Sequence, residues 1–370
     1  MDTQPIATME TSEKQKAGLV SRIRMRTKLL GNIAKKTLLP AGKPTNLILY
    51  VTDACRGRCI HCFVPINKGI KLGIDKIEEI SRFYSNPMSG VAFTGGDPFL
   101  RPELPQIAEL FWKNNGVEAI HIPSNGLHPE LHTKMVRDIL NKVGSEVTVA
   151  LSLDCLGEQY DIFRGVRGNF EKMQETYDLM AQVAKENPRC KIVVNSVITN
   201  KTVDGIKELI TFVRKRMPKV WMHDFDLVRD EPLDKTVLLP PMEKLQEIRP
   251  ILHENYNHYL NRMGAALKKY QYDLNLLVLQ KQRQIPKCKA PDTYLVVEQN
   301  GAVAFCELRN PVGNINITPL EEIWKSQLAE NMRNSVARGE CHCTHGCFQP
   351  LNILYNPIQS AIPLIQYAVK

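Results

Sequence analysis

Short apolar runs alternate with amphipathic stretches along the chain between residues 47 and 228. Runs rich in β-branched residues predict strands at 47–52, 91–94, 119–123, 147–153, 192–198 and 220–228. Apolar residues at helical spacing predict helices at 74–84, 103–114, 129–143, 170–185 and 203–217. Such alternation favours parallel strands joined by crossover helices, so the expected fold class is α/β, a partial (β/α)6 barrel of the TIM type.

This alternation ends after Arg229. Prolines at 232, 240, 241 and 250 interrupt a connector over 229–287, which otherwise has a helical pattern to about residue 284. Two further strand-like runs, 294–298 and 302–306, flank Asn300–Gly301, a strong hairpin signal. A helix is expected around 320–337, followed by an apolar tail over 351–370. We therefore expect a second, smaller unit after the barrel.

The first 46 residues make up a basic amphipathic segment. No acidic residue occurs between Lys14 and Thr52, and apolar residues from Leu19 to Leu38 recur near helical spacing. The basic positions are Lys14, Lys16, Arg22, Arg24, Arg26, Lys28, Lys35, Lys36 and Lys43. A helix of this kind can lie on an anionic membrane surface, or it can pack on the barrel with its basic face solvated. Nucleic acid is not an expected partner, because no aromatic residues are interleaved with the basic ones.

The composition is that of a soluble globular protein, with 370 residues, 43% apolar and 24% charged, enough for roughly two domains. The chain begins without the apolar core of a signal peptide, and no segment reaches the ~18 uninterrupted apolar residues of a membrane span. The ten cysteines are clustered, which fits metal binding in a reducing compartment. The expected location is the cytoplasm, with the basic segment raising the option of attachment to a membrane surface.

Three cysteines stand directly after the first predicted strand, in the pattern Cys55-x3-Cys59-x2-Cys62. Soft sulfur ligands select iron–sulfur clusters, zinc or copper(I). A structural zinc site would need a fourth ligand, such as His61 or a distant residue, whereas a [4Fe–4S] cluster can accept three cysteines. The spacing and its place after the first strand resemble the radical SAM superfamily. That resemblance implies a [4Fe–4S] cluster whose open iron is chelated by S-adenosylmethionine.

A glycine pair follows the second predicted strand, in Thr94-Gly95-Gly96-Asp97-Pro98. Paired glycines let a backbone approach a ligand closely, and a carboxylate beside them can hold an ammonium group. The motif resembles the Gly-Gly-Glu-Pro motif of the same superfamily, which implies that Gly95, Gly96 and Asp97 bind the amino group of S-adenosylmethionine. Asp97 replaces Glu and is shorter by one methylene.

Polar residues mark the ends of the later predicted strands. The resemblance implies that they contact the ribose and carboxylate of S-adenosylmethionine, and capping or turn roles are the alternative. These cofactor-binding candidates are Ser124, Asn125, Ser152, Asp154 and Asn195. The segment 164–170 also resembles one common in the superfamily, without a chemical role being assigned to it. Residues 47–228 would then form the radical SAM barrel.

Five more cysteines lie in the last quarter of the chain, at Cys288, Cys306, Cys341, Cys343 and Cys347. With Gly301-x4-Cys306, they resemble the SPASM/Twitch auxiliary-cluster region, expected over 288–350. The full SPASM pattern has seven cysteines and two clusters, so five imply one auxiliary [4Fe–4S] cluster. Its expected ligands are Cys288, Cys306, Cys343 and Cys347, with Cys341 as the fifth candidate. A zinc site is the alternative.

Three residues are candidates for acid–base or radical chemistry. Cys155 follows the fourth predicted strand, Asp224 lies in the sixth, and Glu307 directly follows a cysteine of the second group. Carboxyl ends of barrel strands are where chemistry gathers in such folds. Each residue has a plain structural alternative, since isolated cysteines are often small buried hydrophobes and carboxylates are often solvated or ion-paired.

These features predict a radical SAM enzyme that takes an electron from an external donor, cleaves S-adenosylmethionine and abstracts a hydrogen from an unactivated carbon. The expected substrate is a lipid, a sugar or another small metabolite. Maturation of a ribosomally made peptide is the alternative, although the region before Leu47 is short for a leader-recognition domain. A zinc-binding protein without catalysis is a third reading.

Overall fold

The computed structural model describes residues 42–84, 86–229 and 231–369. The expected basic helix lies almost entirely outside these residues, so its proposed association with a membrane surface stays a prediction. None of the described helices is long and apolar enough to cross a membrane.

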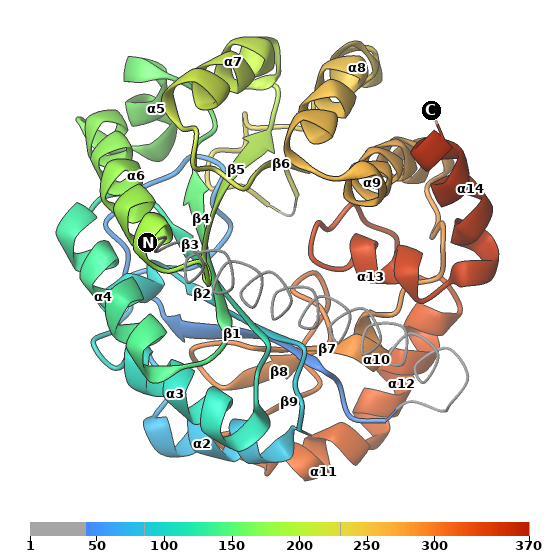
Figure 1. The fold of residues 1–370 in the computed structure, drawn as a ribbon. Helices are drawn as coiled ribbons and strands as arrows, with labels where there is room; N and C mark the ends of the chain where they lie inside the picture. Colours follow the sequence, from blue (N-terminus) through green and yellow to red (C-terminus); the bar gives the residue numbers. More distant parts are fainter. Residues whose placement is uncertain (1–41, 85, 230, 370) are drawn as a thin grey trace, which may run out of the picture.

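Six parallel strands form the barrel wall, in the order β6-β5-β4-β3-β2-β1. They are β1 (Asn46–Thr52), β2 (Gly90–Gly95), β3 (Ala119–Ser124), β4 (Glu146–Ser152), β5 (Cys190–Ile198) and β6 (Met222–Leu227). All six predicted strands are present, within three residues at each end. Figure 1 shows the sheet curving around an interior, with helices on its outer side. The predicted α/β fold class with a partial barrel is confirmed.

Crossover helices connect the strands, and most match the predicted periodicity. They are α2 (Ile74–Phe83), α3 (Leu104–Asn115), α4 (Pro129–Lys142), α5 (Gly157–Arg164), α6 (Asn169–Glu186) and α7 (Ile206–Arg216), with short 3-10 turns η1 (Pro98–Leu100) and η2 (Val203–Gly205). Helix α5 was not expected. It has only eight residues and ends at Gly165, whose left-handed φ of +66° stops the helix.

The two faces of the barrel sheet are packed differently. Outward-facing residues such as Leu49, Val51 and Phe93 are 0% exposed and form the main core with the helices, each contributing roughly 1.5–3 kcal/mol by burial. Inward-facing positions include small residues, Ala92 and Ala150 among them, that line a cavity. A closed TIM barrel fills this interior with bulky side chains. Here the interior stays open, which creates room for ligands.

The connector forms two helices, α8 (Met242–Tyr259) and α9 (Arg262–Lys281), where a single helical stretch was expected. The break falls at Asn261, whose side chain caps α9 by accepting a hydrogen bond from Gly264 N–H at 2.9 Å. The apolar tail forms α13 (Gln349–Leu354) and α14 (Pro357–Val369). Tyr367 of α14 donates a hydrogen bond to Asp273 of α9, which ties the tail to the connector.

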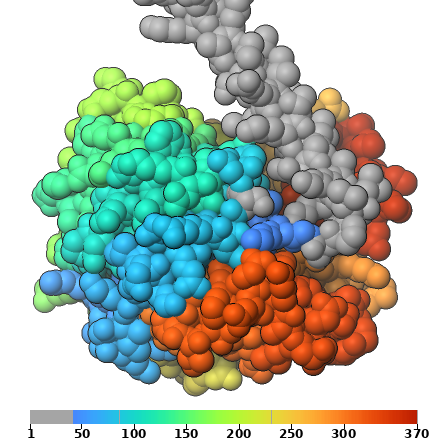
Figure 2. All heavy atoms as spheres, turned by 90° about the horizontal axis from the view of Figure 1, so that it is seen from below, coloured from blue at the N-terminus to red at the C-terminus, as the bar shows by residue number. Residues whose placement is uncertain are grey.

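The C-terminal region continues the barrel sheet past β1. Strand β7 (Tyr294–Val297) pairs with β1 in parallel, and β8 (Ala302–Ala304) and β9 (Gly313–Asn314) follow in antiparallel order. The predicted hairpin is thus present. The remaining elements are α10 (Ala290–Thr293), α11 (Leu320–Lys325) and α12 (Gln327–Ala337). The last two were expected as one helix, but Ser326 caps α12 and divides them. Figure 2 shows the orange surface of α11 and α12 beside the blue surface of the first barrel unit.

Candidate active site

The loop after β1 brings the cysteines of the first motif together around Gly57. A Cβ atom built on Gly57 would lie 3.5 Å from the Sγ atoms of both Cys55 and Cys59, so the two sulfurs converge over a residue without a side chain. Burial raises the pKa of the Cys55 thiol to about 11, and the charges of Asp97, Cys59 and Cys62 add to the rise. These thiols share one electrostatic environment, in which a bound cationic metal centre would favour the thiolate form.

Neighbouring side chains hold this loop in place. The N–H of Cys55 donates to Oδ1 of Asn67 at 2.9 Å, and Nδ2 of Asn67 donates to the Cys55 carbonyl at 2.8 Å. His61, which a zinc site could use as its fourth ligand, stacks on the Phe163 ring at a centroid distance of 4.6 Å. Burial lowers the pKa of His61 to about 4, so the ring is neutral and engaged in packing.

A buried arginine, Arg164 at the end of α5, lies beside this loop. Its Nη1 donates to Sγ of Cys59 at 3.6 Å, and its Nη2 pairs with Oδ2 of Asp154 at 2.5 Å. The other carboxylate oxygen of Asp154 accepts a hydrogen bond from the N–H of Val197 at 2.8 Å. Asp154 was expected to contact S-adenosylmethionine, but its closest partners are protein groups. The sequence resemblance covered Arg164 without assigning it chemistry.

The glycine pair after β2 packs against the backbone of the cysteine loop. Gly95 has a φ of +123°, and a Cβ atom there would lie 2.1 Å from the carbonyl oxygen of Thr52. A Cβ atom on Gly96 would lie 2.3 Å from the carbonyl oxygen of Ala54. The N–H groups of Gly96 and Asp97 donate to those two carbonyls at 2.8 and 2.7 Å. Glycine is therefore needed for two backbones to meet, and this contact ties the motif to the cysteine loop.

Asp97 is buried, and one of its two carboxylate oxygens accepts a hydrogen bond from the described residues while the other, Oδ2, accepts none. Its Oδ1 accepts a hydrogen bond from the N–H of Phe99 at 3.1 Å, and its Oδ2 lies 3.3 Å from Nε2 of His132. His132 belongs to α4, is 0% exposed, and places Nδ1 2.9 Å from Oγ of Ser124. Two residues that were expected separately to bind S-adenosylmethionine are thus joined through a histidine that no sequence motif singled out.

Several buried amide side chains in the described part of the chain keep a polar atom without a hydrogen-bond partner, and two of them, Asn125 and Asn195, are residues that were expected to bind S-adenosylmethionine. Asn195 lies beside Ser152 on the neighbouring strand, and its Nδ2 donates to Oδ2 of Asp226 at 3.2 Å, while its Oδ1 has no hydrogen-bond partner. Oδ1 of Asn125 accepts a hydrogen bond from the N–H of Leu127 at 2.9 Å, while its Nδ2 has none. Buried polar atoms without partners cost free energy, so these two amides are suited to contact a ligand.

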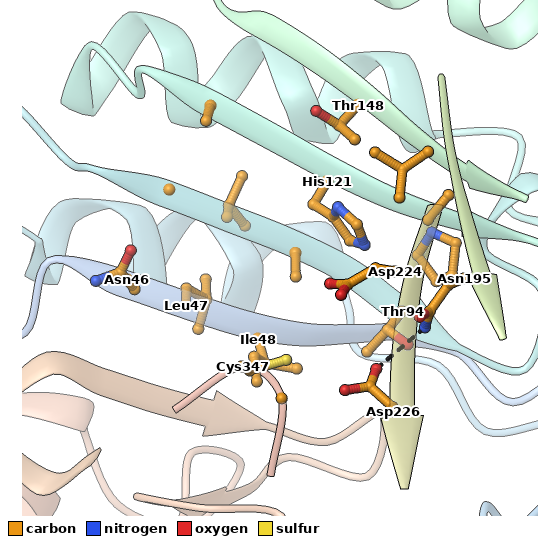
Figure 3. A pocket seen from close by; sticks show the side chains of 18 of the residues that line it. Asn46, Leu47, Ile48, Thr94, His121, Thr148, Asn195, Asp224, Asp226 and Cys347 are labelled. Atoms are coloured by element: carbon orange, nitrogen blue, oxygen red, sulfur yellow. Dashed lines mark hydrogen bonds between the residues drawn. The ribbon is translucent and has the colours of Figure 1, made fainter. Parts of the chain in front are cut away.

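A cavity of about 490 Å³ occupies the interior of the barrel. Its wall is made by residues from all six barrel strands, running from Asn46 at the start of β1 to Thr94, next to the glycine pair (Figure 3). Tyr294, Glu307, Gly346 and Cys347 of the C-terminal region line it too, and Trp221 and Arg229, which flank β6, complete the wall. The cavity therefore connects the end of the barrel that carries the S-adenosylmethionine motif with the auxiliary region.

Glu307 is held by three hydrogen-bond donors at the cavity wall. Tyr50 of β1 donates to its Oε1, and Nε2 of His345 and Nη2 of Arg229 lie 2.5 and 3.4 Å from its Oε2. Burial would raise the pKa of Glu307, but these donors and the charge of Arg229 lower it to about 2. The carboxylate is therefore ionised and weakly basic. This environment favours an anchoring role over the proton-accepting role considered from the sequence.

The other two candidates for chemistry differ in their access to the cavity. Asp224 lines it (Figure 3), and its Oδ2 pairs with Nζ of Lys268 on α9 at 2.5 Å. Cys155 is not among the described residues that line the cavity and packs against the main core. Burial raises the pKa of the Cys155 thiol to about 12, which makes its thiolate scarce at neutral pH.

The five C-terminal cysteines divide between two cavities. A cavity of about 110 Å³ is lined by Cys288, Cys306, Cys341 and Cys343. Burial raises the pKa of Cys288 to about 12, and the charges of Cys343 and Cys341 add to the rise, which shows that these thiols lie near one another. Cys347 lines the large barrel cavity instead, where the charged groups acting on its pKa are Glu307, Arg229, Asp226 and Lys268. The expected grouping of Cys347 with the cluster ligands thus differs from the arrangement in the structure.

Both cysteine groups have the donor chemistry of iron–sulfur ligands. The first offers three thiols in one loop, two of which converge over Gly57, and the second offers four thiols around one cavity, the ligand counts that a site-differentiated and a fully ligated cluster require. Among the described residues, no three His, Cys, Asp or Glu side chains are placed to hold a single metal ion. A zinc centre needs about four such ligands around one ion.

Two family models match this chain. The Radical SAM superfamily model matches residues 49–213, and the SPASM iron–sulfur cluster-binding domain model matches residues 288–347. Together they span more than half of the chain, and they contain the two cysteine groups. The chain belongs to the radical SAM superfamily and carries a SPASM domain. Its cofactors are S-adenosylmethionine, the [4Fe–4S] cluster that binds it, and auxiliary iron–sulfur clusters in the SPASM region.

Similar curated proteins act on different substrates. A probable GTP 3',8-cyclase of Archaeoglobus fulgidus is 26% identical over 50% of this chain and 60% of its own length. A GTP 3',8-cyclase of Staphylococcus saprophyticus is 24% identical over 63% of this chain and 70% of its own length. An Fe-coproporphyrin III synthase of Methanosarcina barkeri is 31% identical, over 33% of this chain and 30% of its own length.

Solved structures share the fold at low sequence identity. SuiB of Streptococcus suis, bound to S-adenosylmethionine, has a TM-score of 0.59 and 15% identity over 89% of this chain and 79% of its own. anSMEcpe, bound to S-adenosylmethionine and a peptide, has a TM-score of 0.58 and 17% identity over 88% of this chain and 99% of its own. At this identity the likeness establishes the fold.

Proposed function

We propose that Cys55, Cys59 and Cys62 hold the cluster at which this enzyme would cleave S-adenosylmethionine reductively, and that the enzyme abstracts a hydrogen from a carbon of a small metabolite held in the barrel cavity. The observation that carries the proposal is the cavity of about 490 Å³, because it runs from Thr94 beside the glycine pair to Glu307 beside the auxiliary cysteines. An external one-electron donor completes the reaction. When bound, the cluster and S-adenosylmethionine supply the adenosyl radical that performs the abstraction.

The residues of this chain supply position and exclusion of water. The glycine pair fixes β2 against the cysteine loop through Thr52 and Ala54, so the motif cannot move independently of the cluster ligands. The free Oδ1 of Asn195 and the free Nδ2 of Asn125 are available for hydrogen bonds to the nucleoside or to the substrate. Asp97 shapes the turn through Oδ1, which accepts a hydrogen bond from the N–H of Phe99, whereas its Oδ2 lies 3.3 Å from Nε2 of His132 without a hydrogen bond among the described residues.

The charges of the cavity favour a neutral or cationic substrate over a triphosphate. Arg229 is the only Lys or Arg among the described residues that line the cavity, and it is paired with Glu307. Asp224 is neutralised by Lys268, whereas Asp226 meets only the amide of Asn195 among the hydrogen bonds of the described residues. Triphosphate sites need several cations or a metal ion. Asp226 is therefore the group that we expect to receive a hydroxyl or ammonium group of the substrate.

A peptide substrate is the second candidate. SuiB and anSMEcpe, which share the fold, were each solved with a bound peptide. One feature of the cavity supports a peptide substrate. Its inward-facing residues Ala119 and His121 are exposed, so the cavity is open to solvent and a peptide segment has a path into it.

For the auxiliary cluster, we propose one [4Fe–4S] cluster held by Cys288, Cys306, Cys341 and Cys343. The support is their shared cavity of about 110 Å³ and the mutual effect of their charges on pKa. Cys347 then remains a free thiol facing the substrate. Glu307 and His345 connect the two cavities, because Glu307 follows a proposed ligand and His345 lies between Cys343 and Cys347.

Deuterium transfer tests the proposed function. Cells grown in deuterated medium would yield small-metabolite, lipid and peptide fractions, each offered to the reconstituted full-length enzyme with S-adenosylmethionine and dithionite. Deuterium in 5'-deoxyadenosine, measured by mass spectrometry, identifies the fraction that contains the substrate. We expect the small-metabolite fraction to transfer deuterium, and purified deuterated GTP to transfer none. Transfer from the peptide fraction alone would establish the second candidate instead, and the variant lacking Cys55, Cys59 and Cys62 is the blank.

A further inference from the structure

The guanidinium of Arg164 is a buried positive charge in contact with a proposed cluster ligand. Its Nη1 lies 3.6 Å from Sγ of Cys59, and the side chain is only 8% exposed. Asp154, which pairs with Nη2 at 2.5 Å, is 0% exposed. Water therefore screens this charge little, so its field at the sulfur is far stronger than that of a surface arginine.

The backbone holds this arginine where it is. The N–H groups of Arg58 and Ile60 donate to the carbonyls of Arg164 and Phe163, each at 3.0 Å, which docks the end of α5 on the cysteine loop. Gly165 permits this approach, because a Cβ atom there would lie 2.5 Å from the Arg58 carbonyl oxygen. The guanidinium also lies over the Tyr160 ring, 5.7 Å from its centroid. Loop and arginine thus form one rigid unit.

We propose that Arg164 sets the reduction potential of the cluster bound by Cys55, Cys59 and Cys62, raising it so that an external donor can reduce it. Reduction adds one negative charge to the cluster. A nearby cation and an N–H donor to a ligand sulfur both stabilise the reduced form relative to the oxidised one. The carboxylate of Asp154 offsets part of this effect. The inference rests on the proposed assignment of Cys59 as a cluster ligand.

The loop offers a matched control in Arg58. This residue is exposed, and its Nη1 donates to the carbonyls of Cys55 and Gly57 at 3.2 and 2.8 Å, not to a sulfur. Arg58→Gln removes the same unit of charge from the same loop but in a solvated position. A general change in net charge would affect both variants alike, whereas a specific contact affects Arg164→Gln alone.

The test is a redox titration of the reconstituted full-length enzyme, followed by electron paramagnetic resonance without S-adenosylmethionine. Arg164→Gln should shift the midpoint potential of this cluster downward. Arg164→Lys keeps the positive charge but lacks the planar set of guanidinium N–H donors, so it should shift the midpoint potential less. Asp154→Asn should shift it upward, because it removes a negative charge. Arg58→Gln should leave it within error of the wild type, and the auxiliary cluster serves as an internal reference.

Iron content separates this inference from the proposed function. If Arg164→Gln retains its iron and its midpoint is unchanged or raised, the inference is overturned while the ligand assignment stands. If Arg164→Gln loses iron, the midpoint potentials of Asp154→Asn and Arg164→Lys are measured instead. A midpoint potential of Asp154→Asn that is not higher than that of the wild type then overturns the proposed role of Arg164. If Cys59→Ala retains the full iron of this cluster, the ligand assignment itself fails, and the inference with it.

Discussion

The two cysteine groups of this enzyme are built in opposite ways. Cys55, Cys59 and Cys62 occupy eight residues of one loop, and local spacing is enough to bring sulfurs together over Gly57. The C-terminal cysteines extend from Cys288 to Cys347 and come from separate segments of the SPASM region. There, packing decides which thiols meet, and it divides them between two cavities. A compact motif fixes its own geometry, whereas a dispersed ligand set depends on the tertiary structure.

Removing the compact group should have the largest effect. Replacing Cys55, Cys59 and Cys62 together by Ala should lower the iron content from about eight to about four per chain and abolish 5'-deoxyadenosine formation, since one [4Fe–4S] cluster is lost. Iron analysis of anaerobically reconstituted protein and chromatography of the nucleoside measure both results. Cys190→Ala is the control, because Cys190 is a buried core residue that should not affect either cluster. Unchanged iron in the triple variant would contradict the assignment.

A pair of single variants tests the dispersed group. Cys341→Ala should lose about four irons, because it removes a proposed ligand of the auxiliary cluster, whereas Cys347→Ala should keep about eight. Burial raises the pKa of the Cys347 thiol to about 12, so in the wild-type holoenzyme prolonged treatment with iodoacetamide at alkaline pH should alkylate Cys347 and spare Cys341, as mapped by peptide mass spectrometry. The reverse pattern, with Cys347 protected and required for iron, would restore the ligand set that the sequence suggested.

The junction between the cysteine loop and β2 should be sensitive to one methyl group. Gly95→Ala forces a Cβ atom to within 2.1 Å of the Thr52 carbonyl oxygen at a φ of +123°. We expect a loss of at least about 3 kcal/mol in the free energy of unfolding, from strain and steric overlap together. Gly168→Ala is the matched control, since Gly168 also has a positive φ but open space around it, so a loss of about 1 kcal/mol is expected. Urea titrations of the two variants would show equal losses if the contact were unimportant.

The smallest expected effect concerns Asp97. Asp97→Asn keeps an oxygen that can accept from the N–H of Phe99, so the turn should survive. Because Oδ1 is engaged by the N–H of Phe99 and Asn keeps a polar group beside His132, the dissociation constant for S-adenosylmethionine should rise by less than about tenfold, under about 1.4 kcal/mol. Isothermal titration of reconstituted enzyme measures it. A larger rise would show that the carboxylate holds the amino group directly, as the motif resemblance implies.

The sequence predicted those features that depend on neighbours along the chain. Strand and helix periodicity located all six barrel strands, and the hairpin at Asn300–Gly301 is present. The position of the cysteine loop and the glycine pair also followed from local pattern. Their contact did not, since glycine was explained by a ligand and not by the carbonyls of Thr52 and Ala54.

The sequence could not predict the contacts between side chains that are far apart along the chain. His132 joins Asp97 to Ser124 from a helix face, where a histidine looks like any other buried residue. Arg164 reaches Cys59 across more than a hundred positions, and the short helix that carries it was missed. Cys341 and Cys347 are six residues apart, but the turn between them sends them into different cavities. Such outcomes depend on three-dimensional packing, which residue spacing does not encode.

The parallel pairing of β1 with β7 has a consequence for synthesis of the chain. One edge of β1 is covered by β2 soon after both emerge, but the other edge waits for Tyr294–Val297. Ribosomes add about 5–20 residues per second, so this edge stays open for roughly ten to fifty seconds. During that time an apolar strand that leads into the cysteine loop presents unpaired N–H and C=O groups, the condition under which strands of different chains associate. Slow translation or truncation before β7 should therefore favour aggregation, and a chaperone that covers β1 would protect the nascent enzyme.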